Sequence, residues 1–284
     1  LIGINQEINR LQRQVTLGWE KEFRTLKWLG LNDGMNILDL GAGPGFFSEL
    51  LLENLPNCKV TLLEPDSDFL NFAKDNLSKY EGRVEFKEES IYNNTLEEGK
   101  YDFVVSRFVF QHLEDPISAS REIYRVLKYG GIVSVIDSDR GVWGISDPDI
   151  LKNERNILGR LEKKTRWNRE VGRKLLKILK LGGFNGLDFE AVAIHSDIVG
   201  VNNIAGKMNI TNDDIKNLSR INPKLARLLK QSKDMINSKN TIIILINLIS
   251  NIIYSLSLFS SYDFKSYDYK EPTYKIMLPK WWNS

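Results

Sequence analysis

A short glycine-rich segment between an apolar run and a helix is the feature of this sequence that most restricts its fold. Residues 36–40 read Asn-Ile-Leu-Asp-Leu, which predicts a short buried strand, and residues 41–45 read Gly-Ala-Gly-Pro-Gly. Helix-forming residues follow from Phe46 to Leu55, and Pro56 ends them. Glycines at such a strand–helix junction let the backbone turn tightly and approach a ligand closely. We therefore expect an α/β fold with a ligand site at this junction.

The alternation of strand and helix continues down the chain. Further strands are predicted at 59–63, 84–87, 101–106, 132–137 and 187–194, and further helices at 66–79, 117–127, 149–164 and 169–181. Asp66 or Ser67 can cap the first of these helices, and Asp115 followed by Pro116 suits the start of the second. This order of elements predicts a mostly parallel sheet with helices on both faces.

Composition excludes several classes of function. The 39 Lys and Arg residues are almost balanced by 37 Asp and Glu residues, so the chain lacks the positive excess of a dedicated nucleic-acid binder. With Cys58 as the one cysteine, an intramolecular disulfide and a thiolate-rich metal site are ruled out. The first residues do not read as a secretory signal, and we expect a cytoplasmic protein.

Residues 240–262 form a run without charge, long enough for a membrane span. Five polar residues in it fall on one helical stripe, namely Asn247, Ser250, Asn251, Tyr254 and Ser255. Asparagines are costly in lipid, so we favour a helix buried in the protein or in a homodimer interface over membrane contact. A pair of strands is the alternative for this run.

The glycine segment belongs to a longer pattern. Asp39 stands two residues before Gly41, the spacing is Gly-x-Gly-x-Gly, and Glu64 ends the second predicted strand. Three later stretches, 101–106, 111–116 and 126–131, complete the pattern. In these respects residues 36–194 resemble a class I S-adenosylmethionine-dependent methyltransferase of the small-molecule branch.

The resemblance implies a set of cofactor-binding residues. In that family the stretch matching Asp39 to Gly45 wraps the methionine portion, the acid matching Glu64 binds the ribose, and the segment after the third strand holds the adenine. One position departs from the family pattern, because Ser90 stands where an Asp usually binds the adenine amino group; Glu89 is the alternative after a register shift. The implied set is Asp39, Gly41, Ala42, Gly43, Gly45, Glu64, Pro65, Ser90, Ile91, Ser106, Arg107 and Gln111.

The resemblance also implies a fold and its additions. We expect a Rossmann-like, mostly parallel sheet of seven strands in residues 31–196. Apolar side chains at helical spacing predict one or two amphipathic helices before it, in residues 1–30. A helical cap or interface insert is expected at 197–262, between strands six and seven. The tail, 263–284, would complete the sheet with a last strand near 273–278.

Candidates for the chemistry follow the fourth and fifth strands, because ligands of open α/β sheets lie beyond the carboxyl ends of strands. His112 and Asp139 are the catalytic candidates, although His112 equally suits a structural role. Phe108, Arg140 and Trp143 are candidates for acceptor binding: aromatic rings suit an apolar acceptor and Arg140 an anionic one. Asp137 and Asp139 could offer carboxylate ligands to a metal ion, but no third obvious carboxylate accompanies them. We therefore expect no metal site.

The sequence therefore predicts an enzyme that transfers a methyl group from S-adenosylmethionine to an oxygen, nitrogen or carbon atom of a small molecule, in specialised metabolism. Residues 106–109 read Ser-Arg-Phe-Val and lack the Asn- or Asp-Pro-Pro-aromatic motif of amino-methylating nucleic-acid enzymes. The alternatives are a non-methylating reaction such as cyclisation on the same fold, a peptide or protein methyltransferase, and a non-catalytic module that associates through residues 240–262.

Overall fold

The computed structural model describes residues 3–139, 145–147, 168, 170–195 and 242–253, with five single positions between 216 and 230. The strands are β1 (Asn36–Leu40), β2 (Lys59–Leu63), β3 (Val84–Lys87), β4 (Tyr101–Arg107), β5 (Leu127–Ser138), β6 (Ile145–Asp147), β7 (Leu187–His195) and β8 (Ile242–Ile253). The helices are α1 (Ile4–Trp28), α2 (Phe46–Asn54), α3 (Ser67–Asn76), α4 (Pro116–Val126) and α6 (Leu175–Leu181), with short 3-10 turns η1 (Ser78–Tyr80), η2 (Phe110–His112) and η3 (Gly172–Lys174).

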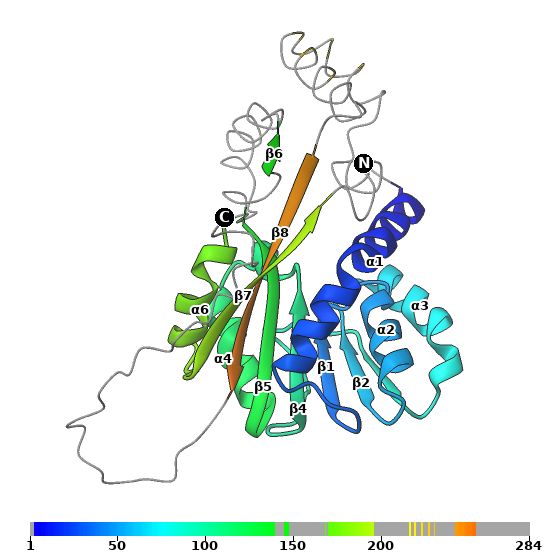
Figure 1. The fold of residues 1–284 in the computed structure, drawn as a ribbon. Coiled ribbons are helices and arrows are strands. Elements are labelled where there is room, and N and C mark those ends of the chain that lie inside the picture. Colours follow the sequence, from blue (N-terminus) through cyan, green and yellow to red (C-terminus); the bar gives the residue numbers. More distant parts are fainter. Residues whose placement is uncertain are drawn as a thin grey trace, which may run out of the picture.

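These strands form one sheet in the order β3-β2-β1-β4-β5-β8-β6, with β7 paired to β8 (Figure 1). Strands β1 to β5 are parallel to one another, as the alternation of elements predicts. From β1 the chain builds β2 and β3 on one side and then crosses to β4 and β5 on the other. The order of the sheet thus reverses between β1 and β4, which is where open α/β sheets bind ligands.

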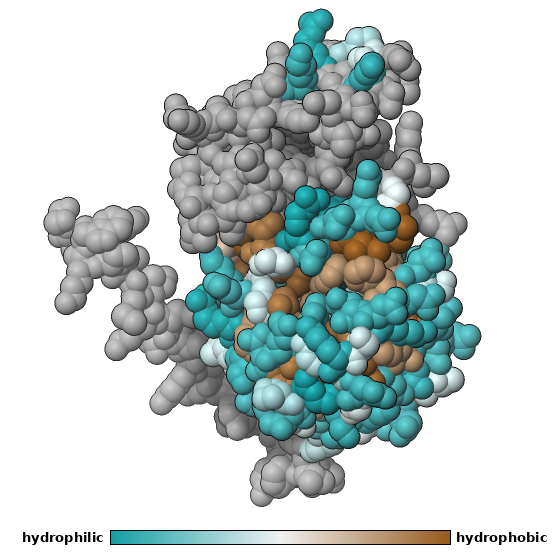
Figure 2. Space-filling model, turned by 90° about the vertical axis from the view of Figure 1, so that its right-hand side faces the viewer, coloured by the Kyte–Doolittle hydropathy of each residue, from teal (hydrophilic) through white to brown (hydrophobic). Residues whose placement is uncertain are grey.

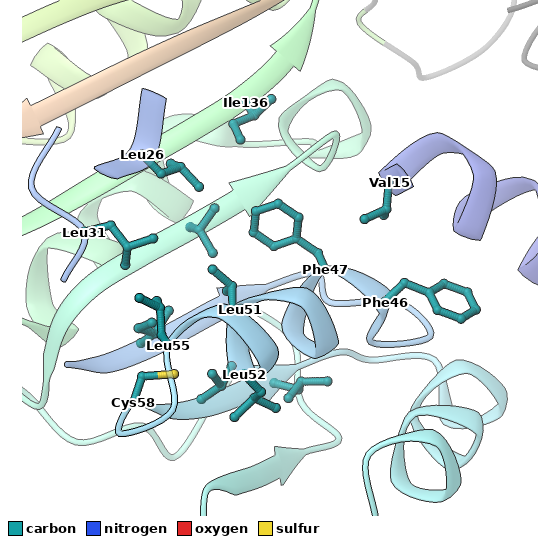
Figure 3. Close-up of a cluster of buried hydrophobic side chains, with 14 of the residues drawn as sticks. Val15, Leu26, Leu31, Phe46, Phe47, Leu51, Leu52, Leu55, Cys58 and Ile136 are labelled. Carbon is teal, nitrogen blue, oxygen red and sulfur yellow. The ribbon is translucent and has the colours of Figure 1, made fainter. Parts of the chain in front are cut away.

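Two hydrophobic clusters lie on opposite faces of the sheet. Side chains of β1 alternate between them: Ile37 packs with α1 and α2, whereas Leu38 packs with α4 and α6. Figure 3 shows the first cluster, in which Val15 of α1 lies beside Phe47 of α2. Fully buried apolar residues on both faces explain why the strand sequences read as continuous apolar runs.

The predicted helix starts are confirmed. A side-chain oxygen of Asp66 accepts hydrogen bonds from the N–H groups of Asp68 and Phe69 at the start of α3. Asp115 caps α4 in the same way, and Pro116 is its first residue. Each aspartate satisfies backbone donors that a helix leaves unpaired at its amino end.

The prediction of a helix in the uncharged run was wrong. Residues 242–253 are the strand β8, which runs antiparallel between β5 and β7. The sheet has eight strands within the described residues, not seven, and its antiparallel strand comes from the range assigned to the cap. The rest of that run (254–262), most of the expected cap, the predicted helix 149–164 and the last strand predicted near 273–278 lie outside the described residues.

None of the helices in the described part of the chain has the length and hydrophobicity of a membrane span.

Candidate functional site

The glycine segment forms a loop between β1 and α2 at the carboxyl edge of the sheet. The N–H groups of Gly41 and Ala42 donate to the carbonyl of Leu63, which ties the loop to the end of β2. Gly41, Gly43 and Gly45 all have positive φ, at 69°, 53° and 78°. L-residues avoid this region, so glycine is what allows the loop to turn here.

Two of these glycines differ in their surroundings. A Cβ on Gly41 would collide with the side chain of Val109, which follows β4, so the loop after β4 packs directly on the glycine loop. A Cβ on Gly43 would meet only Leu11 of α1, at 4.0 Å. The space above Gly43 is therefore open to a ligand, and α1 bounds it.

Glu64 closes the loop from the side of β2. Its Oε2 accepts a hydrogen bond from Gly43 N–H at 2.8 Å, and its Oε1 accepts one from Asp66 N–H at 3.0 Å. Glu64 is largely buried, and burial raises the pKa of its carboxyl, while the two hydrogen bonds act against the rise. The structure thus brings the predicted ribose-binding acid and the glycine loop together.

Asp39 lies beneath the loop, in β1. It is buried, and its Oδ2 accepts a hydrogen bond from the hydroxyl of Ser48 in α2 at 2.7 Å. Burial raises its pKa to about 6. The carboxylate thus joins β1 to α2 beneath the glycine loop.

The expected adenine-binding segment follows β3. Ile91 is buried, and the Ser90 hydroxyl accepts a hydrogen bond from Tyr92 N–H. The alternative, Glu89, is bound by the N–H and hydroxyl of Thr95 at 2.6 and 2.7 Å. Ser90 therefore accepts one hydrogen bond within the chain, whereas both oxygens of Glu89 already accept one, so Ser90 is the better placed of the two to bind adenine. Pro65, the other expected contact beside Glu64, is exposed just before α3.

The segment after β4 carries several of the predicted residues. Ser106 is buried, and its hydroxyl has no hydrogen-bond partner among the described residues. Gln111 donates from its side chain to the carbonyl of Phe108, and its backbone N–H donates to Asp137. His112 ends η2 and is exposed. The hydrogen bond from Arg10 lowers the pKa of Glu7 in α1, and the charge of His112 adds to this effect.

Phe108 is strained. Its φ of 59° is the one positive value among the non-glycine residues that the structure describes, and its ring lies 4.5 Å from the Arg107 guanidinium. Such strain persists only where the surroundings hold it, and it is common at functional sites.

Two charged candidates have partners within the chain. Arg107 pairs with Glu22 of α1, with Nε 2.7 Å from Oε2. Asp139 is buried, and both of its oxygens accept hydrogen bonds from Arg173. Arg140 and Trp143, predicted to bind the acceptor, lie outside the described residues.

The sequence did not identify Glu22 or Asp137 as a residue of the site. Glu22 follows Ile8 and Val15 at seven-residue spacing on the buried face of α1, and an acid on that face was the available signal. Asp137, at the end of β5, accepts from the N–H groups of Gln111 and Ser138, and burial raises its pKa to about 7. No cluster of three metal-binding side chains occurs among the described residues.

The residues present fit S-adenosylmethionine. Open space lies over Gly43, the unpartnered Ser106 hydroxyl is buried at the end of β4, and the acids Asp39 and Glu64 flank the loop. Fold and site together define a Rossmann-like domain with a nucleoside-type cofactor site between β1 and β4.

Comparison with known proteins agrees with this class. Residues 38–135 match the family model described as a methyltransferase domain. A malonyl-[acyl-carrier protein] O-methyltransferase of Ilyobacter polytropus is 33% identical over 99 residues, which cover 35% of this chain and 36% of that protein. A demethylmenaquinone methyltransferase of Listeria monocytogenes is 28% identical over 127 residues, covering 43% and 52%. The chain thus spans about a third to a half of these relatives.

Solved structures share the fold. A phosphoethanolamine N-methyltransferase of Haemonchus contortus, in complex with S-adenosyl-L-methionine, has a TM-score of 0.55 at 19% identity, covering 83% of this chain and 52% of that one. The [4+2]-cyclase SpnF has a TM-score of 0.52 at 20% identity, covering 79% and 76%. The resemblance read from the sequence is confirmed over residues 38–135, which match a methyltransferase domain, and the solved structures confirm the Rossmann-like fold.

Proposed function

We propose that the protein transfers a methyl group from S-adenosylmethionine to an oxygen, nitrogen or carbon atom of a small molecule in specialised metabolism. The observation that carries the proposal is the hydrogen bond that Glu64, at the end of β2, accepts from Gly43 in the loop after β1. The names of the curated relatives give malonyl-[acyl-carrier protein] and demethylmenaquinone as acceptors, which supports methyl transfer to a metabolic intermediate.

The cofactor supplies an activated methyl group when bound, so the chain's task is to bind, align and exclude water. Asp39 and the glycine loop would hold the amino-acid end, Glu64 the ribose hydroxyls, and Ser90 with Ile91 the adenine. Ser106 and Gln111 would bound the site from β4 and η2. The raised pKa of Glu64 follows from its burial, and hydrogen bonds from two ribose hydroxyls would favour its ionised form.

The acceptor would lie on the side of the site formed by the segment after β4. The strained Phe108 would present its ring to an apolar part of the acceptor, with Arg140 and Trp143 as further contacts. His112 is exposed on η2 and would accept the proton of an acceptor that is protonated at neutral pH. Asp139, whose oxygens are taken by Arg173, would position the end of β5.

Methyl-labelled S-adenosylmethionine tests the proposal. The protein is incubated with the labelled cofactor and a metabolite extract, and the small-molecule and macromolecular fractions are analysed by mass spectrometry. We expect the label in a small molecule. Label in the macromolecular fraction would favour a peptide or protein methyltransferase, and a substrate that changes without gaining the label would favour a non-methylating reaction such as cyclisation. Either of these results would overturn the proposal.

A further inference from the structure

Helix α1 lies across the cofactor site. Its buried residues Ile8, Val15 and Leu26 belong to the core shared with α2, and Figure 3 shows Val15 and Leu26 there. Leu11, on the same helix, is the residue that a Cβ on Gly43 would meet. The face that carries α1 to α3 has apolar side chains gathered near the top of the described body, amid a polar surface (Figure 2). The first half of α1 therefore bounds the space over Gly43.

A buried ion pair fixes α1 to the end of β4. The Arg107 Nε is 2.7 Å from Glu22 Oε2, and Nη2 is 3.3 Å from Glu22 Oε1. The Glu22 side chain is fully buried and that of Arg107 is 7% exposed. Nη2 also donates to the carbonyl of Gln14 at 3.0 Å, so the guanidinium contacts α1 two turns apart. Gly18 makes room for the pair, because a Cβ there would collide with the Glu22 carboxylate.

Arg107 also connects α1 to the segment after β4, which borders the cofactor site. It immediately precedes Phe108, and its guanidinium lies 4.5 Å from that ring. The next residue, Val109, packs on Gly41 of the glycine loop. A displacement of α1 that breaks the ion pair thus acts directly on the segment that bounds the cofactor site.

An ion pair at this place differs from an apolar contact because it fixes the position of α1 more than it adds stability. Two well-packed apolar side chains would hold the helix at least as strongly, because burying charges costs solvation energy. The bidentate contact instead fixes one geometry, and the loss of either partner leaves a buried charge uncompensated. This favours a role in placing α1 over one in adding stability.

We propose that Glu22 is a positioning residue for cofactor binding: through Arg107 it holds α1 against the glycine loop, so that α1 forms the outer wall of the cofactor site. The inference rests on the proposed function, because it takes S-adenosylmethionine as the ligand. Cofactor exchange then requires the first half of α1 to move away from Gly43.

The rate at which S-adenosylhomocysteine dissociates tests the inference. Glu22→Gln removes the charge and keeps the shape, and we expect it to speed dissociation at least tenfold. Glu20→Gln makes the same change at an exposed position of α1 and should match the wild type. Lys128→Met breaks the ion pair with Asp102 at the opposite edge of the sheet, away from the site. It should release the ligand at the wild-type rate, which would show that the loss of an ion pair elsewhere in the fold does not speed dissociation. Glu22→Asp keeps the charge and should lie between wild type and Glu22→Gln.

Hydrogen exchange of the wild-type protein gives a second readout that depends on no variant. S-adenosylhomocysteine should slow exchange in α1 as well as in the glycine loop. The inference is overturned if the ligand binds but leaves the amides of α1 unprotected, or if Glu22→Gln releases it as slowly as Glu20→Gln. A wild-type protein that does not bind the ligand at all would instead overturn the proposed function.

Discussion

The carboxylate of Glu64 accepts a hydrogen bond from the backbone N–H of Gly43 at 2.8 Å, and this contact joins the end of β2 to the loop after β1. The second oxygen accepts from Asp66 N–H, at the start of α3. One side chain thus holds both the glycine loop and the start of α3.

Substitution of Glu64 by Gln should weaken cofactor binding strongly. The amide has one acceptor oxygen in place of two, so its NH₂ group would face either Gly43 N–H or Asp66 N–H. A hydrogen bond to a charged group contributes roughly 1.5–3 kcal/mol, and we expect the affinity for S-adenosylhomocysteine to fall at least tenfold. Calorimetric titration measures the change, with Glu98→Gln as an exposed control of equal charge. Equal affinities for the two variants would contradict the role given to Glu64.

The close approach of Val109 to Gly41 predicts a double-mutant effect. Gly41→Ala adds a methyl group that collides with Val109 and strains a backbone at φ 69°, and we expect it to cost about 2–4 kcal/mol of unfolding free energy. Val109→Ala should relieve the collision and recover part of that loss. Gly43→Ala has open space and should cost only about 1–2 kcal/mol, through its φ of 53°. Urea denaturation measures the wild type, Gly41→Ala, Val109→Ala, their double variant and Gly43→Ala. Purely additive losses in the double variant would argue against the packing.

The glycine loop is one of the features that could be predicted from the sequence. The turn, the helix caps at Asp66 and Asp115 and the parallel order of β1 to β5 depend on local residue types and short spacings, which can be read along the chain. The contact between Glu22 and Arg107 joins residues 85 positions apart, and no local pattern encodes that distance.

The strain at Phe108 predicts that glycine is better tolerated there than alanine. Both substitutions remove the ring and its contact with Arg107, but only glycine adopts a φ of 59° without cost. We expect Phe108→Gly to be about 1–2 kcal/mol more stable than Phe108→Ala. Chemical denaturation of the two variants decides the point, and equal stabilities would show that the position is unstrained.

Asp137 predicts a pH dependence of stability. Burial raises its pKa from 3.8 to about 7 in the folded protein, so the folded state binds this proton more tightly than the unfolded state does. Its contribution is therefore fully present below pH 3.8 and is lost as the pH rises through about 7. Asp137→Asn removes the titration and also one acceptor for Gln111 or Ser138, so it should be less stable than wild type at pH ~5.

The deficit of Asp137→Asn should narrow by more than about 1 kcal/mol between pH ~5 and pH ~8, because only the wild type loses the contribution of Asp137 over this range. Denaturation curves at the two pH values measure it. A constant difference would mean that Asp137 titrates at its ordinary pKa in the fold.

The uncharged run is where sequence reasoning failed. Its polar residues at helical spacing favoured a helix, yet residues 242–253 pair with β5 and β7 as an antiparallel strand. The isoleucine run at 242–244 is equally typical of a strand, so local pattern alone did not decide between the two. The position of β8 is set by its pairing with β5, more than a hundred residues away in the sequence, and with β7, about fifty residues away. Such long-range pairing leaves no local signature.

Titration of the wild-type protein with S-adenosylhomocysteine by isothermal calorimetry tests the central claim most directly. A cofactor site made by the glycine loop, Glu64 and α1 predicts saturable binding at one site per chain. The same titration of Glu64→Gln should show much weaker binding. The absence of any heat of binding in the folded wild-type protein would contradict the account.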